Sequence, residues 1–521
     1  MKPAGVSVLA SLAAVIPIPQ GPGASSLPPF QGAPASPAPL SAPAPPRHPF
    51  MASNDRSNIH DDAYMSDTAA FAGPLGRGGI EVRSAQKTGE CASITFDTRG
   101  RLVTVCVGLA GPTLQLLDPV TLATIASFPL PPRDPTAGNP FTSFAGGGYF
   151  YLDDRDRAVI PTTTRHVVVV AEQGDAFVQA RDYDATAVIP QGDQIISALP
   201  DWSGRIWLAS KNGIVATIDP ASGALHAFDT HEPIGNSFAV DEGGGVYVVS
   251  DGAMYRFTAA ADGTPVVAWR TSYANIGVAK PGQTEKGSGT MPTLMGRDYV
   301  AITDNADPMD AIVLNRHTGA VVCTVPVFDK GASDTDQSLI GTDRSVIVEN
   351  NYGYASPLAT EQGATTTGGL ERIDLDPATG TCHVVWRSAE IAPSVVPKLS
   401  LADGLVYTYT KPARTDGQDE WDLTALEFAS GRTVFKALGG EGLGFNNNYA
   451  PITLGPDGTL YLGVLGGIVS WRDRSGPGAG PAASGVRSAR RHERHRHSHR
   501  RHPRRRFRRA VSSGGRYATT R

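Results

Sequence analysis

The chain has 521 residues, of which 58 are Gly and 41 are Pro, and only 18% are charged. This composition is typical of many short strands joined by turns and argues against a protein built from long helices. The net charge of -4 is unevenly divided, because residues 481–521 hold fourteen Arg and one Glu and the first 480 residues therefore carry -17. An acidic body argues against a core that binds nucleic acid.

The first 77 residues carry no repeated pattern. Residues 1–20, MKPAGVSVLASLAAVIPIPQ, place one Lys before an apolar run of signal-peptide length that is short for a membrane span. Residues 19–50 are rich in Pro and Ala and predict a flexible or polyproline-like spacer. We therefore expect a secreted or cell-envelope protein, the alternative being that Met51 is the true first residue. Residues 51–77 are polar and predict an irregular arm on the body.

From residue 78 to residue 474 the pattern is that of β-strands. The clearest unit, 237–270, contains four short strands, SFAVD, GVYVVSD, AMYRFTA and VVAWR. An Asp-Pro-x-Thr/Ser turn precedes the fourth strand of three units, where Asp accepts backbone hydrogen bonds and Pro presets φ. The first two strands recur as eight hairpins, at Ser93–Val105, Tyr149–Ile160, Ala198–Ala209, Phe238–Val249, Thr293–Ile302, Leu339–Val348, Leu399–Tyr409 and Ile452–Gly463.

Eight such units predict an all-β fold, an eight-bladed β-propeller with four strands in each blade. The last unit supplies only three strands, PITLG, TLYLG and GIVSW, before the tail begins. The segment GGIEVRSA at 78–85 alternates Ile80 and Val82 as a strand does. We predict that this N-terminal strand completes the last blade and closes the ring.

The four cysteines form no CxxC pair and no CxxCH haem-attachment site. A turn at Asp97–Gly100 places Cys91 opposite Cys106, which predicts a disulfide and hence an oxidising compartment. Cys323 and Cys382 follow equivalent turns in neighbouring units, and their pairing stays open.

Propeller topology separates the loops into two sets. The links between blades and the loops between second and third strands share one face, which we call the loop-rich face, and they hold the long irregular stretches. Binding residues usually lie on such loops over a rigid scaffold, so we predict a site on this face at the mouth of the channel.

Carboxylate and amide side chains concentrate on that face. Such oxygens are the ligands that Ca²⁺ prefers, although Asp and Asn are also common in loops because they satisfy turn backbones. The candidate metal ligands are Asp304, Asn305, Asp307, Glu349, Asn350 and Asn351.

Other residues of the same face are candidates for ligand binding. The lysines are placed to hold an anionic ligand or a quinone carboxylate, and the tyrosine to stack on a flat ligand; the alternative is that the lysines are solvated. The candidates are Lys398, Lys411, Tyr352, Asn446, Asn447 and Asn448.

Three segments carry a family resemblance: ALEFASGRTVF at 425–435, DPATGTCHVVW at 376–386 and TIDPASGALHAF at 217–228. They resemble the pyrroloquinoline-quinone-like repeat, whose pattern is Ala-x-Asp-x-x-Thr-Gly-x-x-x-Trp. The resemblance implies a β-propeller. Members of that family include quinoprotein alcohol dehydrogenases, which use Ca²⁺ and often an adjacent-cysteine disulfide, and non-catalytic scaffolds of the bacterial cell envelope. This chain has no Cys-Cys pair and thereby departs from the dehydrogenases.

Two hypotheses follow for the function. In the first, a monomeric exported propeller binds a small molecule or a protein on the loop-rich face without catalysis. In the second, the same face belongs to an enzyme, either a quinone-dependent dehydrogenase or a metal-dependent hydrolase or lactonase.

The tail, residues 475–521, is expected to be disordered, and its Arg and His side chains are suited to anionic polymers or transition metals; the alternative is an incidental extension.

Overall fold

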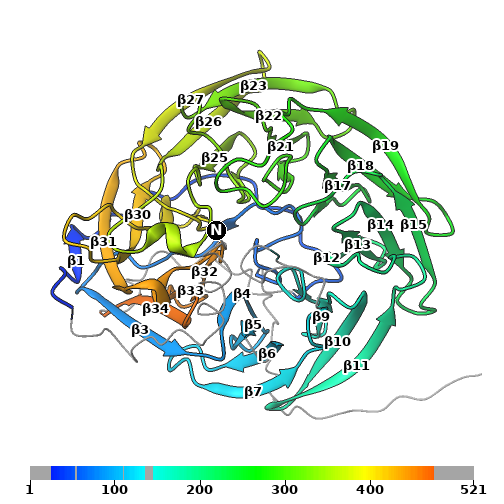
Figure 1. Cartoon of the computed structure of the whole chain (residues 1–521), viewed down its shortest axis with the longest axis horizontal. Coiled ribbons are helices and arrows are strands. Elements are labelled where there is room, and N and C mark those ends of the chain that lie inside the picture. Colours follow the sequence, from blue (N-terminus) through cyan, green and yellow to red (C-terminus); the bar gives the residue numbers. More distant parts are fainter. Residues whose placement is uncertain (1–24, 53–55, 109–110, 135–142, 144, 475–521) are drawn as a thin grey trace, which may run out of the picture. The chain divides into compact units, whose positions relative to one another are not determined.

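The computed structural model describes residues 25–474, apart from residues 53–55, 109–110, 135–142 and 144. Within these residues eight sheets follow one another around a ring (Figure 1). Each sheet is one blade, with its first strand near the centre and its fourth at the rim. The predicted eight-bladed β-propeller is therefore confirmed, including all eight hairpins. The predicted signal segment, residues 1–24, and the tail, residues 475–521, lie outside the described residues.

The strands of the first four blades follow the chain without interruption. Blade 1 contains β4 (Glu90–Phe96), β5 (Leu102–Gly108), β6 (Gly111–Leu117) and β7 (Thr124–Pro129). Blade 2 contains β8 (Tyr151–Leu152), β9 (Ala158–Pro161), β10 (His166–Gln173) and β11 (Ala176–Asp184). Blade 3 contains β12 (Ile195–Pro200), β13 (Ile206–Ser210), β14 (Ile214–Ile218) and β15 (Leu225–Asp229). Blade 4 contains β16 (Ala239–Val240), β17 (Val246–Val249), β18 (Ala253–Ala259) and β19 (Pro265–Ser272).

The last four blades continue in the same order. Blade 5 contains β20 (Thr293–Met295), β21 (Tyr299–Thr303), β22 (Met309–Asn315) and β23 (Val321–Val327). Blade 6 contains β24 (Ile340–Gly341), β25 (Ser345–Glu349), β26 (Leu370–Asp376) and β27 (Thr381–Ser388). Blade 7 contains β28 (Lys398–Ser400), β29 (Leu405–Thr410), β30 (Glu420–Glu427) and β31 (Thr433–Glu441). Blade 8 contains β32 (Ile452–Leu454), β33 (Leu460–Val464), β34 (Gly467–Asp473) and the N-terminal β3 (Ile80–Gln86).

One turn recurs between the first and second strands of blades 1 to 4. In each, an Asp carboxylate accepts hydrogen bonds from the backbone N–H groups two and four residues later. At Asp97 these bonds measure 2.9 and 2.7 Å, and at Asp241 they measure 2.8 and 2.7 Å. The turn is thus set by local chemistry, which is why the hairpins are visible in the sequence.

Strand β3 closes the ring as the sequence predicts. It pairs antiparallel with β34 from Ile80 opposite Asp473 to Gln86 opposite Gly467. The blade that contains the last three strands of the propeller is therefore completed by residues nearly 390 positions earlier.

The Pro/Ala-rich segment is not a free spacer in its described part, which corrects the expectation of flexibility for residues 25–50. β1 (Phe30–Gly32) adds antiparallel to β31 at the outer edge of blade 7, and the Phe30 ring stacks on Phe435 with centroids 5.5 Å apart. Further on, the Ala38 N–H donates to the Asp403 carbonyl at 2.7 Å. Extended backbone without side-chain periodicity hides such a strand from sequence patterns.

Residues 51–52 and 56–69 of the predicted arm run along the inner strands of the ring. β2 (Thr68–Ala69) pairs parallel with β28 of blade 7. The arm thereby occupies backbone donors and acceptors that the inner edges of the blades would otherwise leave unpaired. The backbone hydrogen bonds are Ala52 N–H to Leu152 O at 2.9 Å, Val240 N–H to Ala63 O at 2.8 Å, Leu294 N–H to Tyr64 O at 2.9 Å, Gly341 N–H to Ser66 O at 2.8 Å and Leu399 N–H to Asp67 O at 3.0 Å.

Helical structure is scarce in the described residues. It comprises two single 3₁₀ turns, η1 (Pro357–Thr360) and η2 (Leu443–Phe445). None of these described segments is a helix long and apolar enough to span a membrane.

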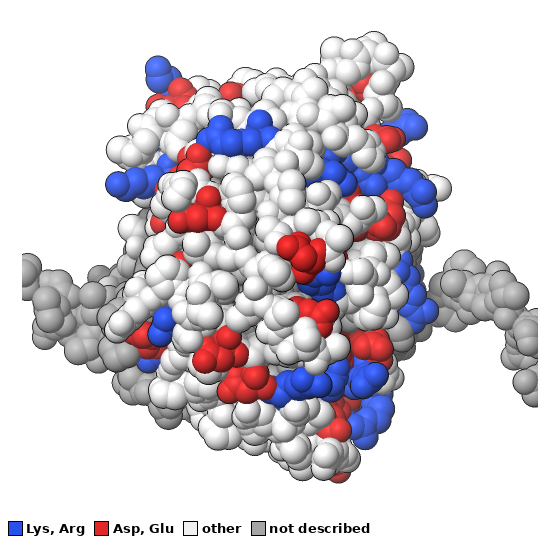
Figure 2. Space-filling view, turned by 90° about the vertical axis from the view of Figure 1, so that its right-hand side faces the viewer, with Lys and Arg blue, Asp and Glu red and all other residues white. Residues whose placement is uncertain are grey.

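Figure 2 shows one side of the molecule, on which acidic and basic side chains are interspersed rather than gathered by sign.

Both cysteine pairs form disulfides. The predicted Cys91–Cys106 bridge is confirmed and joins β4 to β5. Its register differs from the expectation: Phe96 pairs with Leu102, one position off, and a bulge between Glu90 and Ser93 restores the alignment at the cysteines. The pairing that the sequence left open, Cys323 with Cys382, joins the outer strands of blades 5 and 6.

We predict that replacing Cys91 and Cys106 with Ser lowers the free energy of unfolding by about 3 kcal/mol, since the bridge closes a loop of about fifteen residues in the unfolded chain. Urea unfolding of the variant and of the unaltered protein, both without reductant, measures the difference. As a check on the bridges themselves, unfolded protein should show no thiol that reacts with an alkylating agent until a reductant is added. Free thiols before reduction would contradict the assignment.

Candidate functional site

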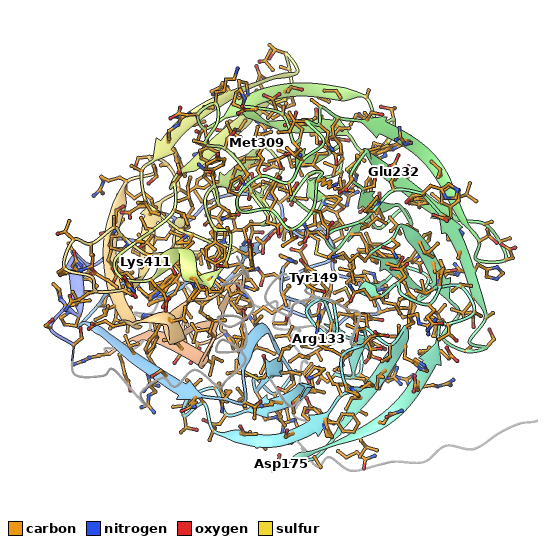
Figure 3. The ribbon with its side chains drawn as sticks, in the orientation of Figure 1. Arg133, Tyr149, Asp175, Glu232, Met309 and Lys411 are labelled. Carbon is orange, nitrogen blue, oxygen red and sulfur yellow. A yellow bond between two sulfur atoms is a disulfide. The ribbon has the colours of Figure 1, made fainter. Side chains whose placement is uncertain are left out.

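A cavity of about 40 Å³ lies among the links that lead into the first strands of the blades. Because these links belong to the segments expected on the loop-rich face, we call it the channel-mouth cavity. Tyr149, which lines it, lies toward the centre of the ring, whereas Asp175 and Glu232 lie toward the rim (Figure 3). Its polar lining residues are His60, Ser93, Tyr149, Asp336, Gln337, Ser338, Asn448 and Tyr449.

The arm contributes His60 to this cavity. The His60 Nδ1 atom lies 3.0 Å from both carboxylate oxygens of Asp67, so Nδ1 carries a proton toward Asp67. The Tyr149 ring stacks against the imidazole with centroids 6.2 Å apart. His60 is 1% exposed, and its Nε2 atom has no hydrogen-bond partner. The imidazole is thus oriented from one side and has an unused nitrogen on the other.

Lys398 supports the same part of the arm. Its ammonium is fully buried, forms an ion pair with Asp67, lies 3.1 Å from Asp61 and donates to the Ile59 carbonyl at 2.8 Å. The predicted role of Lys398 in holding an anionic ligand therefore gains no support, because two carboxylates of the arm already neutralise its charge. Lys398 joins blade 7 to the arm instead.

Two carboxyls of the link before blade 6 lie next to the cavity. Asp336 lines it and is 5% exposed; its Oδ2 atom accepts from Thr284 at 2.8 Å, while Oδ1 has no partner. Burial raises the pKa of Asp336 to about 7. Both carboxylate oxygens of fully buried Asp334 lack partners, and burial, assisted by the charge of Asp336, raises the pKa of Asp334 to about 8.

The three predicted ligand residues Asn446, Asn447 and Asn448 are all buried, and only Asn448 lines the cavity. The Asn448 amide donates to Glu90 at 3.2 Å, and burial raises the pKa of Glu90 to about 8. The Asn446 carbonyl oxygen accepts from the Tyr354 hydroxyl at 2.8 Å, which ties the link before blade 8 to the long loop of blade 6.

The remaining ligand candidates lie away from the cavity. Lys411 is buried; it donates to the Ala364 carbonyl at 2.6 Å and pairs with Asp419 at 3.1 Å, so it fastens the 349–369 loop to blade 7. Tyr352 is half-buried in that loop. Neither lines the channel-mouth cavity.

The six predicted metal ligands form hydrogen bonds with their own and neighbouring loops, although the buried Asn305 Oδ1 atom has no partner. The Asp304 carboxylate accepts from the backbone of Ala306 and Asp310, and the Asn305 amide donates to three acceptors of the 275–286 loop. Asp307 accepts from the Gly331 N–H. These bonds match the alternative role of Asp and Asn in turns.

The second half of the predicted metal set behaves in the same way. Glu349 accepts from Asn351 at 3.1 Å and from Thr408 at 3.3 Å, and burial raises the pKa of Glu349 well above its usual value. The Asn350 amide donates to the Ala332 carbonyl at 2.9 Å. In the described part of the chain no three His, Cys, Asp or Glu side chains converge as a metal site requires.

The cofactor implied by the family resemblance does not fit the centre of the ring. Cofactor pockets usually enclose about 300–1,000 Å³, whereas the channel-mouth cavity measures about 40 Å³. Residues 58–69 of the arm take up the space. We therefore assign no chemistry to a bound quinone.

A larger cavity, of about 340 Å³, lies on the other set of turns, between blades 2 and 3. It is lined by Phe50, Tyr183, Pro200 and the Asp153–Arg157 turn among others, and the sequence did not indicate it. Asp153 and Arg157 form an ion pair there. Among its lining residues, all of them described, no buried polar side-chain atom lacks a partner. This distinguishes it from the channel-mouth cavity.

Comparisons with known proteins agree on the fold and leave the activity open. No family model matches the chain. A curated protein from Archaeoglobus fulgidus, described as uncharacterized, is 29% identical over 316 residues, which is 53% of this chain and 60% of that protein. The chain thus spans less than two thirds of the length of this curated relative.

Among solved structures, the chain is similar to the quinohemoprotein alcohol dehydrogenase from Comamonas testosteroni, with a TM-score of 0.56, 10% identity and 83% of both chains covered. The comparison with BamB from Moraxella catarrhalis gives a TM-score of 0.39 and 14% identity, over 60% of this chain and 93% of BamB. At 10% identity the first likeness shows the propeller fold alone. The quinone-type repeat therefore stays a resemblance.

We predict that Lys398→Met lowers the free energy of unfolding by about 3–5 kcal/mol, because two buried carboxylates lose their cation. Lys211→Met is a matched control: its ion pair with Glu285 is partly exposed, and its loss should cost about 0–1 kcal/mol. Chemical unfolding of both variants at pH 7 measures the two costs. Equal costs would contradict the role assigned to Lys398.

Stability should fall between pH 5 and pH 8.5. A carboxyl whose folded pKa is raised above its unfolded value, near 4, stabilises the fold fully below that value and loses this contribution as the pH rises through the folded pKa. Asp334→Asn removes one such group, so the variant should lose less stability over this interval. Denaturant midpoints at both pH values test this, with exposed Asp329→Asn as the control. An unchanged pH dependence in Asp334→Asn would refute the assignment.

Proposed function

We propose that the protein is an exported, monomeric β-propeller that binds a small ligand, or one side chain of a protein partner, in the channel-mouth cavity without catalysing a reaction. The observation that carries this proposal is a pair of buried polar atoms without partners, His60 Nε2 and Asp336 Oδ1, on residues that line one cavity. Buried polar groups normally have partners, and each exception requires a physical explanation. A bound ligand is such an explanation.

The rigidity of the surroundings supports binding. The cavity is lined by the arm and by links of blades 1, 2, 5, 6, 7 and 8, so its shape depends on the whole ring rather than on one loop. The Asp67 carboxylate orients His60, and Ser338 donates to the same carboxylate. A site held in this way loses little conformational entropy when a ligand binds.

The enzyme alternative has less support. The cavity has room for a few atoms only, and the described residues offer no converging metal ligands. His60 is oriented as a general base would be, and the Ser338 hydroxyl lies 3.1 Å from its Nδ1 atom, but this hydroxyl donates to Asp67 and the Ser93 hydroxyl donates to the Gly148 carbonyl. Export is supported by the two disulfides, which persist in oxidising compartments.

A ligand screen tests the proposal. The purified full chain is heated with representatives of separate chemical classes: organic cations, organic anions, neutral sugars, Ca²⁺ and Zn²⁺. We expect at least one class to raise the melting temperature. Pyrroloquinoline quinone is tested in parallel in a dye-linked assay, where we expect no turnover.

The location is tested with a variant that fills the cavity. Ala92 lines it, and Ala92→Leu should abolish the melting-temperature response to the ligand class found. Ala126→Leu, in β7 and equally half-buried, is the matched control and should keep the response. A response that survives in Ala92→Leu, a wild-type protein that responds to nothing, or quinone turnover would each refute the proposal.

A further inference from the structure

We infer that the group held in the channel-mouth cavity is a primary ammonium, supplied either by a small amine or by the Lys side chain of a partner. This inference rests on the proposed function and specifies the ligand class.

Most of the side-chain hydrogen-bond donors that line the cavity are already in use. Each hydroxyl donates to a protein acceptor, and the Gln337 and Asn448 amides each use one of their two N–H groups, so the lining offers a ligand few donors. These bonds run from Ser93 to Gly148 O, from Tyr149 to Asn236, from Gln337 to Ser394 O, from Ser338 to Asp67, from Asn448 to Glu90 and from Tyr449 to Gly282 O.

Acceptors remain. The Oδ1 atom of Asp336 has no partner although the side chain is more than nine-tenths buried. The His60 Nε2 atom also has no partner, and in a neutral imidazole whose Nδ1–H faces Asp67 it is a hydrogen-bond acceptor. A carboxylate buried without a cation is unfavourable. A cation that donates hydrogen bonds supplies both the missing charge and the missing hydrogen-bond partner.

Size and aromatic lining narrow the choice among cations. A volume of about 40 Å³ holds roughly three water molecules, since one water needs about 10–15 Å³ on this measure. An ammonium with one carbon attached fits that space, and a quaternary ammonium does not. The rings of Tyr149 and Tyr449 line the same cavity, and aromatic faces attract cations.

A metal ion fits less well. Metal sites in proteins need several converging ligands, and no three acidic, His or Cys groups converge among the described residues. An ammonium needs only two or three acceptors, which the cavity supplies.

Methylammonium chloride is the probe for this inference. Titration into the full chain, followed by calorimetry and melting temperature at constant ionic strength, should show saturable binding. Sodium chloride and tetramethylammonium chloride should show none. Nα-acetyl-lysine N-methylamide serves as a second probe. If it also binds, the source of the ammonium is a partner's Lys, and if only methylammonium binds, the source is a small amine.

The variant Asp336→Asn keeps the shape and removes the charge, so methylammonium binding should weaken at least tenfold. The variant should fold, because it replaces a buried carboxyl by a neutral group; a melting temperature at or above that of the unaltered protein confirms this. Asp343→Asn, in the turn between β24 and β25 of the same blade, is the matched control and should bind as the unaltered protein does.

The outcomes separate the two proposals. If an anion or a sugar binds and Ala92→Leu abolishes that binding, the proposed function stands and the ammonium inference fails. If no compound of any class binds, both fail. Unchanged methylammonium binding in Asp336→Asn also refutes the inference.

Discussion

The central constraint on this propeller is that the backbone of the arm, at residue 52 and residues 63–69, hydrogen-bonds to the inner strands of five blades. In an open ring the backbone donors and acceptors at the inner edges of the first strands have no partners. Here the arm supplies partners for many of them. The arm has further consequences. It reduces the central space to a small cavity, it inserts His60 there, and it requires Lys398 as the buried counterion of Asp61 and Asp67.

The small size of the cavity is the reason why we propose ligand binding rather than quinone chemistry. A ring of this kind with an open centre has room for a cofactor, and the likeness to a quinohemoprotein dehydrogenase concerns that ring alone. In this chain the same volume is taken up by protein. In our proposal the residual space receives a single small group, and specificity comes from unpaired acceptors rather than from contact area.

The blades could be predicted from the sequence because their hairpins depend on contacts between residues close together in the chain. Asp97, Asp241 and their equivalents set the hairpins of blades 1 to 4 within five residues, and β3 was identified because the last blade lacked a strand. Less of the proposed site could be predicted. Asn448 was a predicted ligand residue and lines the proposed cavity, whereas His60 and Asp336, which also line it, lie in segments without periodicity and were not predicted. Their proximity depends on contacts across hundreds of residues. The Asp and Asn residues that stood out as metal ligands serve their own loops, and sequence does not distinguish these uses.

The position of strand β1 has a consequence for the order of events during synthesis of the chain. Phe30 pairs with Ala437, so the N-terminal segment emerges roughly 20–80 s before its partner at ordinary rates of chain elongation. The arm can pair with blade 2 as soon as that blade has been made, whereas β1 has to wait for β31 of blade 7. Closure of the ring comes later still, because β3 pairs with β34, the last strand of the propeller.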